Sequence, residues 1–337
     1  TYGLSGNVDP AMVAVNTIRY FATPSSITNM PYANFSNYYN PLLRWETSQM
    51  INMATDFQFK NKRFSGTIEY FQKLGKNLFG ASPIDLTTGV SSSILRNVAS
   101  MKGRGWDVEL KSVNVDRAIQ WRTIVNFNIY KDEIREYLLT RTLANQYTTS
   151  AVPISNIPGS PVYTIYAYKW GGLDPNTGEA QGYLNNEISK DYSSIVGRGT
   201  NVSDLLSFGS AIPTKSGSVI NTFSYKRVNL QAGVTYKLGY WFRRNSINYT
   251  DLFNNWRGHS DYGLRWQKPG DEANTDVPAI FYTTNSAREQ FYSGSGVLVE
   301  KGNHIRLQFI NLAFDLNSKS VVRKYFKDSQ LYVNASN

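Results

Sequence analysis

Apolar and polar residues alternate with a period of two along much of the chain. From Leu43 to Phe59 the odd positions are mainly apolar and the even positions mainly polar. Because successive strand side chains point to opposite faces, this pattern predicts a long strand with one apolar and one polar face. Similar alternation occupies residues 64–70, 106–111, 119–129, 228–238 and 305–314. We therefore predict an antiparallel sheet of about ten strands after a short opening strand.

The last of these segments changes parity. Ile305, Leu307 and Phe309 are followed by Ile310, Leu312 and Phe314, so the apolar positions change from odd to even numbers. One extra residue in a strand causes such a shift. We predict a β-bulge near Phe309.

The connections between the predicted strands are of two kinds, which alternate. Short turns lie at 61–62, 115–117, 174–178 and 226–227, with a medium one near 317–328. Long loops lie near 5–41, 79–102, 136–161, 185–216 and 243–302. A soluble sandwich has no reason to sort its loops in this way, whereas outer-membrane barrels have short periplasmic turns and long extracellular loops. The pattern predicts an all-β fold, an antiparallel transmembrane β-barrel, with the long loops outside the cell.

Composition agrees with this fold class. Aromatic residues reach 14% and charged residues only 18%, and no apolar run is long enough for a membrane-spanning helix. Cysteine is absent, which excludes disulfides, cysteine nucleophiles and thiolate metal sites. The net charge of +10 is spread in short clusters such as Lys60–Arg63, Arg243–Arg244 and Arg323–Lys324. Spread charge of this kind is typical of solvated turns, so we expect no nucleic-acid partner.

The two faces of the predicted sheet carry different residues. Aromatic side chains near strand ends on the apolar face are typical of the girdles that meet lipid headgroups. These are Trp45, Trp106, Trp121 and Tyr240. Charged side chains on the polar face would be costly in a narrow barrel but can line the lumen of a wide one. These are Arg44, Glu46, Asp56, Glu69, Asp107, Glu109, Lys111, Arg122 and Lys237.

Ordered motifs along the chain resemble a known family. Tyr2–Asn7 is similar to the Tyr-Gly-x-x-Gly-Asn segment of the SusC/RagA family of TonB-dependent outer-membrane transporters. Leu43–Glu46 resembles the family's Leu-x-Trp-Glu strand, and Arg63–Phe71 its Arg-Leu-Ser-Gly strand. Asn97–Leu110 resembles a further strand motif, with Gly103 and Asp107 in place of the usual Asn and Glu. Similar segments follow at 172–178, 266–271 and 305–310.

The resemblance implies a multi-pass protein of the bacterial outer membrane. The family barrel has 22 strands and an N-terminal plug, and this chain resembles only its C-terminal part. A SusD-like surface lipoprotein and the TonB–ExbB–ExbD complex are the implied partners, with outer-membrane lipid around the barrel. The implied cargo is an oligosaccharide or a peptide. We expect both ends of the chain to be cut, and the plug residues that couple to TonB to lie outside it.

Candidate chemistry is sparse. Asp174–Glu179 resembles the start of a calcium loop, but a tight turn with Gly178 at positive φ accounts for it better. Asp271, Glu272 and Asp276 form a second acidic cluster, which a solvated loop explains better than Ca²⁺. No carboxylate pair for glycoside hydrolysis can be assigned. We expect no catalytic residue, no metal and no cofactor, and hence no enzyme.

The aromatic loop at 243–302 is the best candidate for contact with substrate or with the lipoprotein, because Tyr, Trp and Arg are enriched at interfaces. Trp256 and Tyr262 are the candidate contact residues, whereas Trp266 is expected to pack within the loop. Two alternatives to an importer stay open. One is a secreted all-β carbohydrate-binding or hydrolytic protein, and the other is a passive porin.

Overall fold

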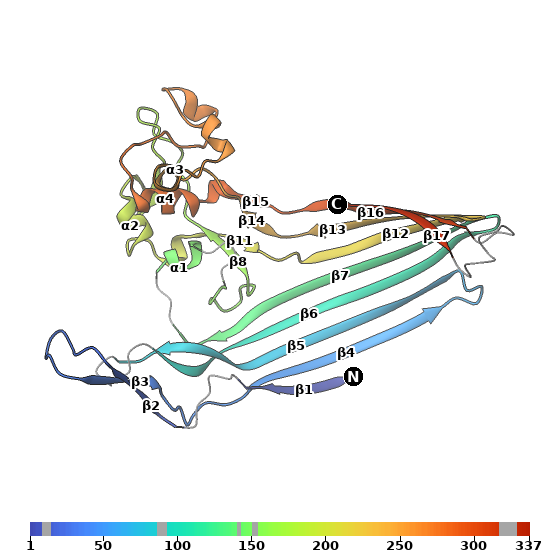
Figure 1. Cartoon of the computed structure of the whole chain (residues 1–337), viewed down its shortest axis with the longest axis horizontal. Helices are drawn as coiled ribbons and strands as arrows, with labels where there is room; N and C mark the ends of the chain where they lie inside the picture. Colours follow the sequence, from blue (N-terminus) through green and yellow to red (C-terminus); the bar gives the residue numbers. More distant parts are fainter. Residues whose placement is uncertain (9–14, 86–92, 140–142, 150–153, 317–328) are drawn as a thin grey trace.

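The computed structural model describes residues 1–8, 15–85, 93–139, 143–149, 154–316 and 329–337. Its main feature is one nine-stranded antiparallel sheet in which every strand pairs with its neighbours in chain order, apart from strands inserted in the loops. The long strands run side by side across Figure 1. They are β1 (Tyr2–Asn7), β4 (Glu46–Gln58), β5 (Phe64–Pro83), β6 (Ser93–Asp116), β7 (Ile119–Tyr137), β12 (Lys215–Tyr225), β13 (Val228–Leu238), β16 (His304–Asp315) and β17 (Gln330–Ser336).

The connections at the two ends of the strands differ in length. The β4–β5, β6–β7 and β12–β13 connections lie at one end of the strands, together with the end of β16 and the start of β17 (Figure 1). These three connections are short turns, at 59–63, 117–118 and 226–227. The other end carries the β1–β4, β5–β6, β7–β12 and β13–β16 connections, and the two last of these run over 138–214 and 239–303. The three shortest connections thus share one end of the strands, and the two longest share the other.

Two expectations about these connections are wrong. The predicted loop at 79–102 is mostly strand, because β5 continues to Pro83 and β6 begins at Ser93. The segments on either side of the 174–178 turn do not join the sheet, so 136–161 and 185–216 are parts of a single connection. All four residues of Thr164–Ala167 are buried, whereas a strand of the sheet would have one exposed face. This accounts for a sheet of nine strands where about ten and a stub were predicted.

The bulge near Phe309 is confirmed. In the β13–β16 pair, Gly233 lies opposite Phe309 and Val234 lies opposite Leu307, so Gln308 is the extra residue. A second irregularity in the β5–β6 pair leaves Lys76 and Asn77 without partners, and Asn77 has a φ of 57°. Each irregularity reverses which face the following residues occupy.

The β7–β12 and β13–β16 connections fold together into a compact unit, which we call the loop subdomain (Figure 1). The first contributes α1 (Asn145–Thr148), β8 (Thr164–Ala167), β9 (Gly182–Leu184), β10 (Glu187–Ser189), α2 (Tyr192–Val196), η2 (Val202–Asp204) and β11 (Leu206–Ser210). The second contributes β14 (Trp241–Arg243), α3 (Tyr249–Asn255), η3 (Ser260–Leu264), η4 (Asp271–Ala273), α4 (Ser286–Ser293), η5 (Gly296–Leu298) and β15 (Val299–Lys301). Among the described residues, no helix is long and apolar enough to cross a membrane.

Aromatic packing holds the loop subdomain together. Phe291 of α4 is fully buried, and its ring lies 5.8 Å from that of Tyr168, 6.2 Å from Trp170 and 5.8 Å from Tyr192. The three partners come from the other connection. Paired buried rings stabilise a fold by more than the burial of their apolar surface alone.

A separate hairpin of β2 (Thr17–Phe21) and β3 (Tyr32–Asn37) projects from the end of the sheet that also carries the loop subdomain (Figure 1).

Candidate functional site: the polar face and the loop subdomain

One face of the sheet carries a continuous polar surface across its central strands. Glu69, Asp107 and Asn128 lie directly opposite one another on β5, β6 and β7. The Asn128 amide donates to the Asp107 carboxylate. The neighbouring row contains Asp56 and Glu109, and Asp56 accepts a 2.6 Å hydrogen bond from the Thr67 hydroxyl. The predicted carboxylates of the polar face are thus brought together.

These rows border a shallow hollow of about 360 Å³. Glu69, Asp107 and Glu109 line it together with the amides of Asn126 and Asn128. An ion pair of 2.6 Å joins the Lys111 ammonium to Glu109, and both side chains are about half exposed. Exposed pairs of this kind contribute at most about 1 kcal/mol, so the hollow is a wetted surface and not a rigid charged core.

The remaining charged residues of the predicted set take different places. Lys237 lies opposite Ser216, which lies opposite Asn128, so Lys237 shares the polar face. Arg122 lies opposite Thr222 and Val113. Arg44 precedes β4 at the end of the sheet with the long connections and is exposed.

Glu46 has a structural role that its motif did not predict. Its carboxylate accepts hydrogen bonds of 2.8 Å from the backbone N–H of Phe79 and from the amide of Asn7. The first of these N–H groups lies just beyond the β5 irregularity at Asn77. Because a backbone donor released by a bulge needs a partner, Glu46 stabilises the junction between β1, β4 and β5.

The four predicted girdle aromatics are not equivalent. Trp45 is 63% exposed and its ring lies against Gly6. Trp121 stacks on Phe223 at 5.6 Å near the short turns, and its indole N–H donates to Asn221. Both lie near strand ends, as predicted.

Trp106 departs from that expectation, whereas Tyr240 lies just beyond the end of β13. Trp106 is in the middle of β6 and not near a strand end, because β6 extends back to Ser93. Its ring lies 5.0 Å from Tyr70. Tyr240 follows β13 and its hydroxyl lies 3.2 Å from Nδ1 of His304.

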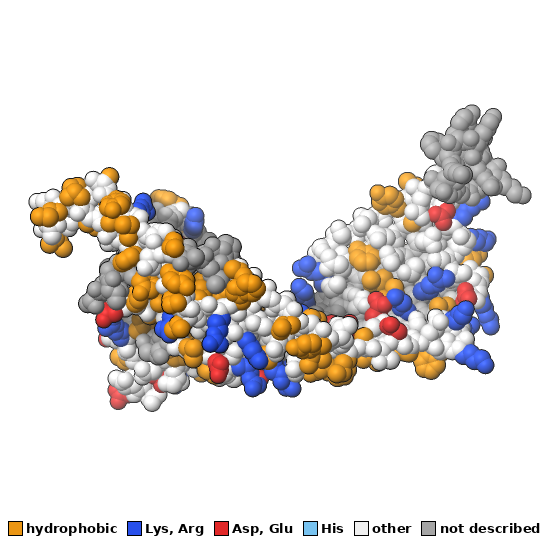
Figure 2. All heavy atoms as spheres, turned by 90° about the horizontal axis from the view of Figure 1, so that it is seen from below, with side chains coloured by type: hydrophobic (Ala, Val, Ile, Leu, Met, Phe, Trp, Pro, Cys, Tyr) orange, Lys and Arg blue, Asp and Glu red, His pale blue; other side chains and the backbone are white. Residues whose placement is uncertain are grey.

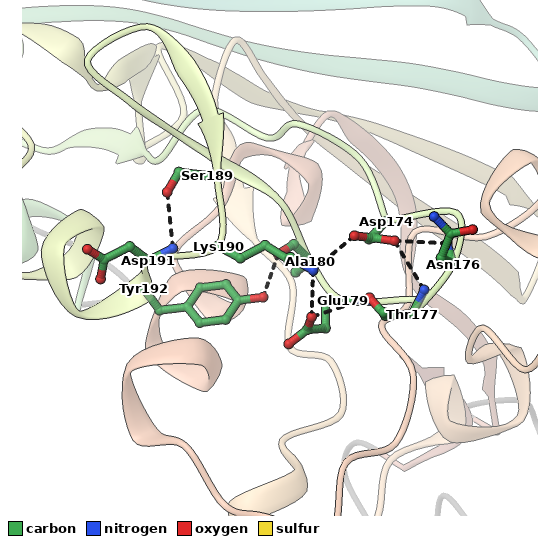
Figure 3. Close-up of polar contacts among 9 residues, drawn as sticks. All are labelled: Asp174, Asn176, Thr177, Glu179, Ala180, Ser189, Lys190, Asp191 and Tyr192. Atoms are coloured by element: carbon green, nitrogen blue, oxygen red, sulfur yellow. Dashed lines mark hydrogen bonds and ion pairs between the residues drawn. The ribbon is translucent and has the colours of Figure 1, made fainter.

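The candidate calcium loop is a tight turn stabilised by a lysine. Gly178 has a φ of 68°, which confirms the predicted left-handed position. The Asp174 carboxylate accepts from the backbone N–H groups of Asn176 and Thr177, as an Asx turn does (Figure 3). The Lys190 ammonium then donates to Asp174 at 2.9 Å and to Glu179 at 2.8 Å (Figure 3). The hydrogen bond from Lys190 lowers the pKa of Asp174, and the bonds to Glu179 and Asp174 raise the pKa of Lys190.

The second acidic cluster also satisfies local donors. Asp271 accepts from the backbone N–H groups of Gln267 and Lys268, at 3.0 Å each. Glu272 accepts from the indole N–H of Trp266 at 3.1 Å, and Trp266 is only 8% exposed. The expected packing of Trp266 within its loop is thus confirmed. Among the described residues no group of three or more His, Asp and Glu side chains is arranged to hold a metal ion.

Trp256 and Tyr262 have different surroundings. Trp256 ends α3 in a left-handed conformation and is 91% exposed. Tyr262 is partly covered, because the Arg265 guanidinium lies 4.0 Å from its ring centroid. Tyr282 is exposed as well and stacks on Phe253 at 5.7 Å. The sequence did not single out Tyr282, since nothing in its neighbourhood distinguishes it from the buried aromatics of the same loop.

A half-buried arginine and a buried glutamate of the loop subdomain, Arg243 and Glu289, border a second hollow of about 320 Å³. The Arg243 guanidinium donates to the backbone oxygens of Thr148 and Tyr166, which ties the two long connections together. Glu289 accepts from the backbone N–H of Tyr249 at 2.9 Å, and burial raises its pKa. Both charges are engaged with the protein's own backbone, as buried charges require.

Comparison with known proteins agrees with this fold. No protein-family model matches the chain. TonB-dependent receptor P26 of Formosa agariphila is 23% identical over 366 residues, and TonB-dependent receptor P3 of the same organism is 20% identical over 353 residues. Each alignment covers the whole chain and 34% of the relative, so the chain spans about a third of the length of these proteins.

Solved structures with a similar fold also match the whole chain. A structure of the RagAB peptide transporter matches with a TM-score of 0.72 at 21% identity, over the whole chain and 36% of its counterpart. The RagAB peptide importer in a closed-closed state matches with a TM-score of 0.68. The relatives are described as receptors and transporters. The resemblance to SusC/RagA-type TonB-dependent transporters, which the ordered motifs indicated, is confirmed over the full length of this chain.

Proposed function

We propose that this chain is part of a SusC-like, TonB-dependent importer of the bacterial outer membrane. In this proposal the nine-stranded sheet is a section of the wall of a 22-stranded barrel. Its apolar face contacts lipid and its polar face, with Glu69, Asp107 and Glu109, lines the lumen. The long connections are then extracellular and the short turns periplasmic.

Two features together carry the proposal. The shortest connections lie at one end of the strands and the longest at the other, and the long strands have one apolar and one polar face. The two faces differ as a barrel wall requires, because Val125, Val219 and Val234 lie in one cross-strand row while Glu109, Asn126 and Ser218 lie in the next. A soluble sheet with one wet face would also have two-faced strands, but it would have no reason to gather its short connections at one end of the strands.

We further propose that the loop subdomain contacts cargo and a SusD-like lipoprotein. Trp256 is the strongest candidate contact, since it is a large aromatic side chain that is almost fully exposed. Tyr262 and Tyr282 are further candidates. Peptides are the favoured cargo, because the RagAB structures to which the fold is similar are described as a peptide transporter. Oligosaccharides are the second choice.

The test uses the full-length protein with its neighbouring lipoprotein in the outer membrane of its own host. Uptake of a labelled mixture of peptides, and separately of oligosaccharides, is measured with and without TonB and with and without the proton gradient. We expect TonB-dependent uptake of one cargo class and its loss when either protein is deleted. TonB-independent uptake would instead indicate a passive porin. A parent protein that stays monomeric in aqueous buffer without detergent would overturn the membrane assignment altogether.

A further inference from the structure

Six cationic side chains gather at the end of the sheet that carries the short turns. We call them the basic rim: Lys60, Lys62, Arg63, Arg117, Lys226 and Arg227. These residues are scattered along the sequence, but the hairpin topology brings them to one end of the strands. Figure 2 shows Lys and Arg side chains along this end of the molecule. All six are exposed, and within the described ranges none of them forms a salt bridge.

Nearby carboxylates do not neutralise the rim. In the described ranges the last three residues of the strands beside the turns carry three carboxylates, Asp56, Asp116 and Asp315, against six cations, and Asp56 already accepts a hydrogen bond from Thr67. Asp315 already accepts hydrogen bonds from the amides of Asn229 and Gln330. The rim therefore has a clear excess of positive charge facing solvent.

Two lysines of the rim occupy turn positions that favour other residues. Lys62 has a φ of 57° and Lys226 a φ of 53°. This left-handed region suits Gly or Asn and is unfavourable for a long side chain. A tight turn would form more readily without lysine, so turn formation does not explain the charge at these positions.

An aromatic belt lies immediately beside the rim on the apolar face. The rings of Phe57, Phe59 and Phe64 cluster within 5.7–6.2 Å of one another. On the neighbouring strands Trp121 stacks on Phe223, and the Lys226 ammonium lies 5.2 Å from the Tyr225 ring centroid. Apolar wall, aromatic belt and cationic rim follow one another along the same strands.

We propose that the basic rim binds the anionic headgroups of phospholipids in the membrane leaflet on the short-turn side. The order of the layers matches a leaflet, in which hydrocarbon is followed by the interface and then by phosphate. Aromatic rings favour the interface, and lysine and arginine extend from it toward phosphate. A nucleic acid or a soluble acidic protein would match the charge but would leave the exposed belt without a partner. The inference rests on the proposed function only in that the sheet must span a membrane.

The experiment replaces the two left-handed lysines by asparagine in the full-length protein (Lys62→Asn and Lys226→Asn together). A matched control removes two exposed cations of the loop subdomain (Arg198→Gln and Arg257→Gln). Each protein is purified in a neutral detergent and titrated with phosphatidylglycerol, and its melting temperature is followed. A parallel titration uses inorganic phosphate at equal ionic strength.

We expect phosphatidylglycerol to raise the melting temperature of the wild type and of the control to the same extent. The lysine variant should need a higher lipid concentration, by about fivefold for each charge removed. Without lipid it should melt no lower than the wild type, since asparagine suits the left-handed turns. A merely structural role for these lysines would predict the opposite, a lower melting temperature in detergent alone.

Three outcomes would overturn the proposal. The first is an equal lipid response of the wild type and the lysine variant. The second is a response to inorganic phosphate equal to that of the lipid, which would mean an anion site without a lipid. In either case the proposed importer would still stand if the protein inserts into membranes. The third is failure of the full-length wild type to insert into phosphatidylglycerol nanodiscs, which would remove the proposed function as well.

Discussion

Gly178 shows how a single backbone position ties the loop subdomain together. A Cβ atom at this residue would lie 2.4 Å from the Trp266 ring and 2.8 Å from the Cβ of Ala279. The residue is also left-handed. Gly178→Ala should therefore destabilise the loop subdomain by about 1–3 kcal/mol, from backbone strain and from the displaced indole. The measurement is the melting temperature of the full-length protein followed by tryptophan fluorescence.

The matched control for that variant is Gly258→Ala. A Cβ at Gly258 has open space and the residue is not left-handed. The control should melt within experimental error of the wild type. Equal destabilisation by both substitutions would show that the contact with Trp266 is unimportant.

Lys190 gives the turn at 174–178 a dependence on pH. The lowered pKa of Asp174 means that its contribution is present above the unfolded value of 3.8 and is lost as the pH falls through the lower folded value. The raised pKa of Lys190 means that its contribution is lost above 10.5. Lys190→Met should therefore destabilise the protein modestly at pH 7, and the difference from the wild type should vanish in strong acid. Stability curves against pH for both proteins provide the check, and a difference that persists at pH 2 would contradict the ion pair.

Residue roles were only partly readable from the sequence. The left-handed Gly178 followed from turn chemistry, and the burial of Trp266 followed from its place in a shared motif. Glu46 was assigned to the polar face because it alternates with apolar neighbours. Its bonds to Phe79 and Asn7 depend on an irregularity in another strand, which period-two reasoning along one strand cannot reveal.

At the scale of the strand, the register separates two apolar positions that alternation treats alike. Val125 lies opposite Val219 and Leu110, well inside the sheet. Leu230 lies opposite Phe223, in the row of Trp121 beside the short turns. If the sheet spans the membrane as proposed, Val125→Arg should cost about 2–4 kcal/mol of stability, because it would place a cation near the hydrocarbon centre. Leu230→Arg should cost about 0–1 kcal/mol, because the guanidinium can reach the interface.

These values can be measured by denaturant unfolding of the full-length protein in vesicles. Asn126→Arg is the matched control, since Asn126 neighbours Val125 but lies on the polar face beside Glu109. It should assemble normally. If the control failed and Val125→Arg assembled, the assignment of lipid and lumen faces would be reversed.

Element boundaries show where sequence reasoning succeeded and where it could not. The long two-faced strands and a bulge near Phe309 were predicted, because alternation and its change of parity are local signals. The strands around the 174–178 turn were assigned to the wall, although β8 belongs to the loop subdomain. A short apolar segment looks alike in a sheet and in a buried core, and only contacts between the two long connections, such as those of Phe291, decide between them.

For the whole molecule, the edges of the sheet matter most. Both edge strands are exposed throughout, β1 on one side and β17 on the other. Their outer backbone groups have no partner strand in the described sheet. In a lipid environment each unpaired backbone group costs several kcal/mol, and in water an open edge invites aggregation. In the proposed barrel, neighbouring strands would pair with both of these edges.

This pairing gives a prediction for the chain as a whole. Residues 1–337 produced alone should not yield a folded monomer, either in aqueous buffer or in detergent, whereas the full-length protein should fold in detergent. The loop subdomain does not rescue the fragment, because its core packs the loops against one another and covers neither edge of the sheet. Heat-modifiable migration on a gel, together with the circular dichroism of strands, compares the two proteins. Supplying the remaining strands as a separate polypeptide should restore folding if the open edges are the cause. A fragment that is monomeric, strand-rich and soluble by itself would show that its edges are protected in another way, and the sheet would then not be a section of a larger wall.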